Sequence, residues 1–111
     1  MEKQDWMKKL VLKTQKYRQY EKRFKLWLGI IGMSKQAKYY MPFHVREMLC
    51  FMEERGIEEL ENINPEQIRN YFQYLSIRSN QRRGGALSKG TMNKHLQAIK
   101  KFSEYVWRAN K

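Results

Sequence analysis

The chain has 111 residues and a formal net charge of +12 at neutral pH. A chain of this length forms one small domain and is too short to enclose a large cleft between two domains. The excess of basic residues favours nucleic acid, an anionic membrane surface or an acidic protein as partner, and charge alone does not choose among them.

The first predicted element is a basic amphipathic helix over residues 5–31. Apolar residues such as Tyr17 and Phe24 recur at helical spacing, and lysines and arginines occupy much of the remaining surface. We expect this helix to pack on its own domain, because Ile30 and Ile31 belong to a run that is too apolar to remain exposed. The same pattern also fits a helix that lies on a membrane surface, which stays open as an alternative.

A second helix is predicted to begin after Gly32, which ends the first, with Ser34 as its N-cap and Gly56 as its stop. Pro42 removes a backbone donor and is expected to kink this helix, or even to make residues 34–41 a separate turn. Apolar residues occupy more than one side, so we expect the helix to be central. Its predicted core stripe is Met41, Val45, Met48, Leu49 and Met52.

A short acidic connection over residues 57–63 leads to the third predicted helix. Asn64 is placed as its N-cap and Pro65 as its first residue, because proline tolerates the first helical position. The apolar spacing continues to Ile77, where we expect the helix to end.

The fourth predicted helix spans residues 87–108 and follows a basic, glycine-rich loop over residues 78–86. Ser88 is its predicted N-cap. The expected apolar stripe is Met92, Leu96, Ile99, Phe102 and Val106, and the opposite face carries Gly90, Lys94, Gln97, Lys101 and Arg108. No segment alternates as a strand does, so the predicted fold is all-α with four helices.

Charge is distributed unevenly along the chain. Residues 1–39 carry a net +8, residues 40–77 a net −4, and residues 78–111 a net +8. A compact fold could bring the two basic segments together as one positive surface and turn the acidic segment away.

No pattern in the sequence indicates a metal, a cofactor or catalysis. The two histidines, His44 and His95, have no cysteine or carboxylate at metal-ligand spacing. The glycines near Lys89 lack the preceding strand and the motif of a phosphate-binding loop. The adjacent glutamates after residue 52 are interpreted as solvated charges at a helix end. We therefore expect no metal, no cofactor and no small-molecule substrate.

Cys50 is the only cysteine, so an internal disulfide is excluded and a reducing compartment is favoured. The N-terminus is highly charged, and the first apolar run, residues 26–33, is too short to span a bilayer. We therefore expect no secretory leader, no membrane partner and a cytoplasmic location.

Three segments, taken in order, resemble the N-terminal core-binding (SAM-like) domain of tyrosine recombinases, also called phage integrases. Residues 24–56 are similar to the first helix and capped second helix of that family, and residues 57–76 to its connection and third helix. Residues 87–107 resemble its fourth helix. The resemblance implies a SAM-like four-helix orthogonal bundle over residues 24–109, preceded by a basic helical extension over residues 1–23.

The resemblance also implies a function. In this family the domain forms one arm of a clamp around duplex DNA during integration and recombination, and its second and fourth helices face the major groove. The partners would be double-stranded DNA and other recombinase protomers. The family's catalytic residues belong to a downstream domain, so no DNA cleavage is expected of this chain. Some DNA-binding residues are implied by the resemblance, and others are suggested by their charge or side-chain amide. The full predicted set is Ser34, Lys35, Gln36, Lys38, Tyr39, Arg82, Arg83, Lys89, Thr91, Asn93, Lys94, Gln97 and Lys101.

A different class of function stays open beside DNA binding. A helical protein-interaction module could use the basic ends of the chain to bind an acidic partner or a second copy. In that case Tyr39, Tyr40, Phe43 and Phe51 would form an exposed aromatic patch.

Overall fold

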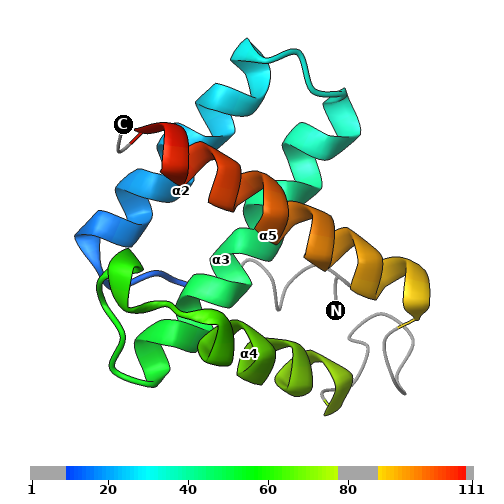
Figure 1. Ribbon diagram of the computed structural model, residues 1–111. Coiled ribbons are helices and arrows are strands. Elements are labelled where there is room, and N and C mark those ends of the chain that lie inside the picture. The colour runs from blue at the N-terminus through cyan, green and yellow to red at the C-terminus, as the bar shows by residue number, and fades with distance from the viewer. Residues whose placement is uncertain (1–9, 78–87, 110–111) are drawn as a thin grey trace.

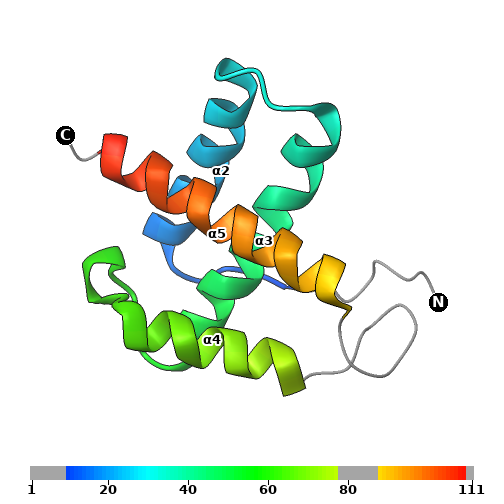
Figure 2. The same ribbon diagram turned by 45° about the vertical axis from the view of Figure 1, so that its right-hand side comes forward.

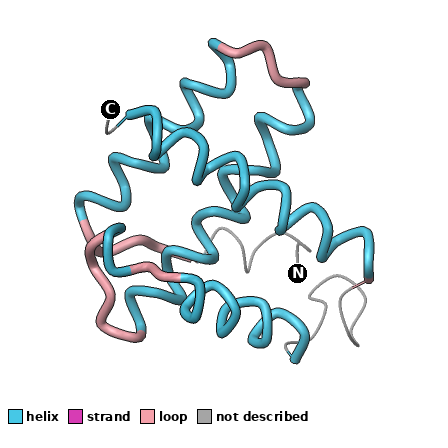
Figure 3. Tube along the Cα trace, viewed as in Figure 1, coloured by secondary structure: helices cyan, strands magenta, loops and turns pink. Residues whose placement is uncertain are grey.

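The computed structural model describes residues 10–77 and 88–109, and within these ranges the chain is helical and contains no strand (Figures 1 and 3). This confirms the predicted all-α class. The elements are α2 (Gln15–Ile30), α3 (Lys35–Glu54), a short 3-10 helix η1 (Leu60–Asn62), α4 (Pro65–Ile77) and α5 (Lys89–Ala109).

Helix α3 is the central element, as predicted, because it packs against α2, α4 and α5. Helices α2 and α3 run in opposite directions as a hairpin, and α5 crosses over this pair (Figures 1 and 2). Helix α4 packs against α3 near the end of the molecule where α2 begins. At the opposite end, the first turn of α3 exposes Lys35 and Gln36.

Three of the four helices begin at the residues that the sequence predicted. Ser34, Asn64 and Ser88 each accept a hydrogen bond from the backbone N–H three residues further on, at 3.1, 3.0 and 3.1 Å. Gly32 and Gly56 both have φ of +78°, the left-handed conformation in which a glycine ends a helix without strain. The local signals therefore determine where α3, α4 and α5 start.

The predicted start of the first helix is wrong, because residues 10–14 are not helical. Leu12 is buried, and the carboxylate of Glu53 on α3 accepts hydrogen bonds from the backbone N–H groups of Lys13 at 3.1 Å and Thr14 at 2.6 Å. A carboxylate from another helix thus caps α2, and the preceding residues pack against α3 instead of extending the helix.

One core joins all four helices. Tyr17 of α2 is fully buried and its hydroxyl donates to the carbonyl oxygen of Ile57 at 2.7 Å. Burial raises the pKa of Tyr17, so the hydroxyl stays protonated as this bond requires. Phe24 packs edge-on against Phe102, with ring centres 5.3 Å apart. Leu12 and Tyr17 belong to this core, so the described residues before 24 pack with the rest of the domain. All five residues of the predicted α3 stripe are buried: Met41, Val45, Met48, Leu49 and Met52.

The end of α2 is more exposed than predicted. Ile30 is 82% exposed and Ile31 is 41% exposed. Leu28 is fully buried, and two residues further along a helix the side chain points about 200° away, so Ile30 must face solvent. The expectation that both isoleucines are covered is wrong.

The buried stripe of α5 is also rotated from the predicted one. Leu96 is 38% exposed, while His95, Ala98 and Tyr105 are buried beside Ile99 and Phe102. Tyr105 packs against Trp27 of α2, with ring centres 5.5 Å apart. His95 and Tyr105, whose rings carry polar groups, are thus buried, whereas the apolar pattern predicted burial of Leu96.

Helix α3 continues through Pro42, so the alternative of a separate turn over residues 34–41 is wrong. Ala37, Met41 and Pro42 itself are buried. Their packing holds the turns before the proline in the helix, although Pro42 cannot donate to the preceding turn. The kink at Pro42 stays a prediction.

Candidate nucleic-acid interface

The start of α3 places its predicted contact residues at the surface. Lys35 and Gln36 are exposed, Lys38 is half-buried, and the Tyr39 side chain is 53% exposed. Ser34 is exposed, but its oxygen accepts the capping hydrogen bond of the helix. The role of Ser34 in the fold is therefore structural, and the residues after it are available to a partner.

The first half of α5 exposes most of the predicted contact residues. Lys89, Asn93, Lys94 and Gln97 are all exposed. Thr91 is half-buried, and its hydroxyl accepts a hydrogen bond from the capping Ser88 at 3.1 Å. Two lysines and two amide side chains are thus presented by about two turns of one helix.

Lys94 connects this part of α5 to α3. Its Nζ atom lies 5.6 Å from the ring centre of Tyr40, within the range of a cation–π contact. Gln36 precedes Tyr40 by one turn, on the same side of α3. The two predicted helices therefore meet at Lys94. We call the exposed residues Gln36, Lys89, Asn93, Lys94 and Gln97 of these helices the α3–α5 face.

The second half of α5 is less positive than its sequence suggests. Lys101 is half-buried and pairs with Glu104 at 3.5 Å, and Arg108 pairs with the same carboxylate at 3.6 Å. Glu104 therefore offsets part of the charge of two of the cations predicted for this side of the helix. The positive electrostatic potential of α5 is therefore strongest near its N-terminus.

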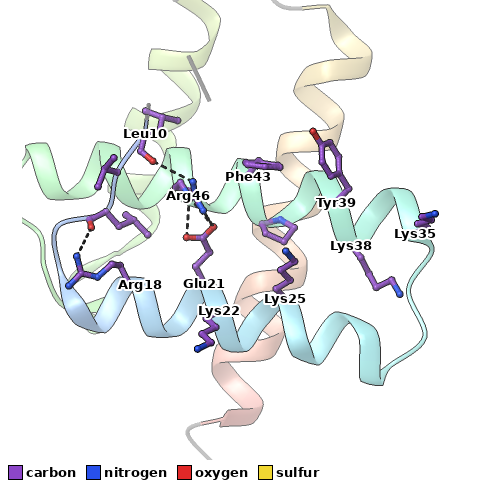
Figure 4. Close-up of a pocket in the computed structure, with 13 residues that line it drawn as sticks. Leu10, Arg18, Glu21, Lys22, Lys25, Lys35, Lys38, Tyr39, Phe43 and Arg46 are labelled. Atoms are coloured by element: carbon purple, nitrogen blue, oxygen red, sulfur yellow. Dashed lines mark hydrogen bonds and ion pairs between the residues drawn. The ribbon is translucent and has the colours of Figure 1, made fainter. Parts of the chain in front are cut away.

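Lys35, Lys38 and Tyr39 do not face α5 but line an open groove between α2 and α3 (Figure 4). The groove has a volume of about 720 Å³. We call it the α2–α3 groove. Its basic residues are Arg18, Lys22, Lys25, Lys35, Lys38 and Arg46.

A single acidic residue, Glu21, is found among the described residues that line the groove. It pairs with Arg46, whose Nη2 atom lies 2.8 Å from a carboxylate oxygen, and both side chains are largely buried. Arg18 donates to the carbonyl oxygen of Leu12 at 3.2 Å. Because Arg46 and Glu21 neutralise each other, the lysines dominate the electrostatic potential of the groove.

The sequence prediction missed the contribution of α2 to this site. Arg18, Lys22 and Lys25 follow one another at spacings of four and three, which places them on one side of a helix. This spacing can be seen in the sequence, but it does not indicate that Lys35 and Lys38 of the next helix line the same groove. The predicted set is thus divided between two surfaces of α3.

Acidic residues gather at the other end of the fold. Glu53 and Glu54 lie at the C-terminus of α3, about 30 Å along the helix axis from Lys35. Lys16 pairs there with Glu59 at 2.9 Å. These acidic residues thus lie away from the start of α3, whereas the union of the two basic segments into one positive surface stays a prediction.

The remaining predicted residues, Arg82 and Arg83, lie outside the described residues. Within residues 10–77 and 88–109, no three His, Cys, Asp or Glu side chains are grouped so that they could hold a metal ion. No helix in these ranges is long and apolar enough to cross a membrane. Cys50 is buried, and burial raises the pKa of its thiol to about 11.

Comparison with known proteins gives no family for the chain. No family model matches it, and neither the curated proteins nor the solved structures contain a significant match.

Proposed function

We propose that this domain binds duplex DNA as the core-binding domain of a tyrosine recombinase. The observation that carries the proposal is the contact between Lys94 and Tyr40, because it joins the exposed polar residues of α3 and α5 into one basic face. The glutamates at the far end of α3 lie away from this face. A polyanion would therefore be attracted to one end of the molecule and repelled from the other.

The residues of the α3–α5 face suit two kinds of DNA contact. Lys89 and Lys94 carry mobile point charges that can neutralise phosphates, which gives affinity with little dependence on sequence. Gln36, Asn93 and Gln97 carry exposed amides, the groups that can pair with an adenine edge in the major groove. The proposal is sequence-tolerant binding, with base contacts restricted to these amides.

The finer description of the fold is part of the same proposal. We assign the four helices to a SAM-like orthogonal bundle, in which α3 and α5 correspond to the DNA-facing second and fourth helices of the family. The observed order of helices and the crossing of α5 over the α2–α3 hairpin support this assignment. In the complete recombinase, a catalytic domain would close the opposite side of the DNA.

The direct test is a fluorescence anisotropy titration with a duplex of about 30 base pairs at several salt concentrations. The isolated domain should bind with a Kd of about 10⁻⁴ to 10⁻⁶ M, because it forms only half of the clamp. If about five phosphates are neutralised, the slope of log K against log salt should be about −4.5.

A charge-reversed variant locates the binding surface. Lys94→Glu should weaken duplex binding at least about tenfold at low salt, because it removes one phosphate contact and adds a repulsive charge. Arg69→Glu is the matched control, since Arg69 is exposed on α4 and the net charge of the two variants is identical. Equal loss in both variants would show that only net charge matters and would contradict the proposed face.

A protein-interaction module is the second candidate, and one observation favours it. An apolar groove of about 460 Å³ lies between α5, η1 and α4, and Trp107 at its edge is 61% exposed. The aromatic patch expected for this function is not formed, because Phe51 is buried against Tyr71 and Tyr74 of α4. Self-association that persists at high salt and is lost in Trp107→Ala would support this candidate.

A further inference from the structure

The α2–α3 groove and the α3–α5 face lie on different sides of α3. Lys38, Tyr39 and Phe43 line the groove, whereas Tyr40 and His44 face α5. Figure 4 shows the side chains of Lys25, Lys38 and Tyr39 around the groove. A ligand in this groove would therefore not use the same contacts as a duplex on the α3–α5 face.

We infer that the α2–α3 groove binds single-stranded nucleic acid, with phosphates against its lysines and a base stacked on Tyr39. The inference rests on the proposed function in one respect, that the partner is a nucleic acid. It adds a second surface and a second form of ligand, an unpaired strand.

The charge of the groove fits a phosphate backbone. Lys22 and Lys25 of α2 and Lys35 and Lys38 of α3 approach the groove from both sides, and Glu21 is neutralised by Arg46 at 2.8 Å. Lysines on two walls can follow the successive phosphates of one strand. An acidic peptide could also pair with these lysines, but its carboxylates and backbone would not stack on an aromatic ring.

The aromatic residues of the groove provide that surface. The ring of Tyr39 is held by Phe43, with ring centres 5.1 Å apart and ring planes 68° apart, and 53% of the residue stays exposed. Arg46 lies over the other aromatic ring, with its guanidinium carbon 5.6 Å from the centre of Phe43. An exposed ring that is fixed by its neighbours is a stacking platform for a nucleobase.

The remaining lining and the shape favour an unpaired strand over a duplex. Leu10, Val11 and Pro42 make part of the groove apolar, and Val11 is 65% exposed. Apolar surface beside lysines suits bases and phosphates together. A duplex stacks its bases inside and cannot insert one into a groove between two helices without unpairing it, whereas a single strand can.

The test compares two labelled ligands by fluorescence anisotropy at low salt: an oligothymidylate of about 12 nucleotides and a duplex of about 30 base pairs. Tyr39→Leu should weaken binding of the single strand about tenfold, because it keeps an apolar side chain but removes the stacking ring. Tyr39→Phe should bind like the parent. Both substitutions are at an exposed position, and circular dichroism would verify that the helices are retained.

The double variant Lys22→Glu/Lys25→Glu should lose single-strand binding while it keeps most duplex binding, and Lys94→Glu should show the reverse pattern. Single-strand affinity that is unchanged in Tyr39→Leu would overturn the inference, as would competition by polyglutamate as effective as competition by unlabelled strand. A parent that binds duplex but no single strand would overturn the inference and leave the proposed function standing. A parent that binds single strand but no duplex would support the inference and overturn the proposed binding of duplex DNA.

Discussion

The imidazole rings of His44 on α3 and His95 on α5 lie with their centres 3.8 Å apart, and His95 is only 1% exposed. Tyr71 of α4 adds its hydroxyl 3.4 Å from Nδ1 of His95. The two histidines thus lie where α3 and α5 pack together, directly behind the contact between Lys94 and Tyr40. Their packing therefore supports the α3–α5 face.

We predict that His95→Ala lowers the free energy of unfolding by about 2 kcal/mol or more, because the substitution removes a buried ring at the place where α3, α4 and α5 meet.

Urea unfolding of the parent and the variant at pH 7 tests this prediction. A variant as stable as the parent would contradict the structural importance of this buried ring.

The capping of α2 by Glu53 gives a second prediction. Partial burial favours the neutral carboxyl, but hydrogen bonds from Thr14 and Lys13 outweigh it and hold the pKa of Glu53 below its ordinary value. The charged form therefore stabilises the fold above the ordinary pKa of a glutamate, and this contribution is lost as the pH falls through the lowered value. At pH 7, Glu53→Gln should cost about 1–2 kcal/mol.

Thermal or urea unfolding of this variant and the parent at pH 7 and pH 3 tests the assignment. The two proteins should differ at pH 7, and the difference should shrink as the pH falls through the lowered pKa of Glu53 and the parent carboxylate becomes protonated. Glu54→Gln, an exposed neighbour, is the control and should change stability little. If both substitutions lowered the free energy of unfolding equally, the hydrogen bonds of Glu53 to the start of α2 would not contribute to stability.

Removing the charge of Glu104 should strengthen DNA binding. Its carboxylate pairs with Lys101 and Arg108, so Glu104→Gln releases two cations and removes a repulsive charge beside the α3–α5 face. We expect duplex affinity to rise about twofold to fivefold at low salt, a gain that shrinks as salt screens it. Glu61→Gln, exposed at η1, makes the same change of net charge and should have a smaller effect. A larger gain from the control would contradict the location of the site.

The rotated stripe of α5 predicts opposite outcomes for two apolar residues. Phe102 is buried against Phe24, so Phe102→Ala should cost about 3–5 kcal/mol. Leu96→Ala should cost less than about 1 kcal/mol, because the side chain is 38% exposed. Chemical unfolding measures both, and a large loss in Leu96→Ala would restore the stripe expected from sequence.

The parts of the fold that could be predicted from sequence are those with local causes. Ser34, Asn64 and Ser88 cap their own helices through atoms three residues away, and Gly32 and Gly56 end helices by their own conformation. These signals need no knowledge of the rest of the chain. The three helix starts follow from them, and the all-α class follows from the helical spacing of apolar residues and the absence of a segment that alternates as a strand does.

The parts that could not be predicted depend on residues far apart in the sequence. Helix α2 begins where it does because Glu53 reaches the backbone at Lys13 and Thr14 from another helix. The α5 stripe is rotated because Tyr105 packs on a ring of α2. The α2–α3 groove was missed for the same reason, since its lysines come from two helices whose relative rotation no local pattern gives.

Backbone amide chemical shifts, followed as a DNA duplex is added, would locate the binding surface on the domain. If α3 and α5 form the DNA-binding face, the largest changes should occur at Gln36, Lys89, Asn93, Lys94 and Gln97, with little change in α4 and η1. Changes concentrated in α4 and η1, or no change at low salt, would contradict the claim that α3 and α5 form a DNA-binding face.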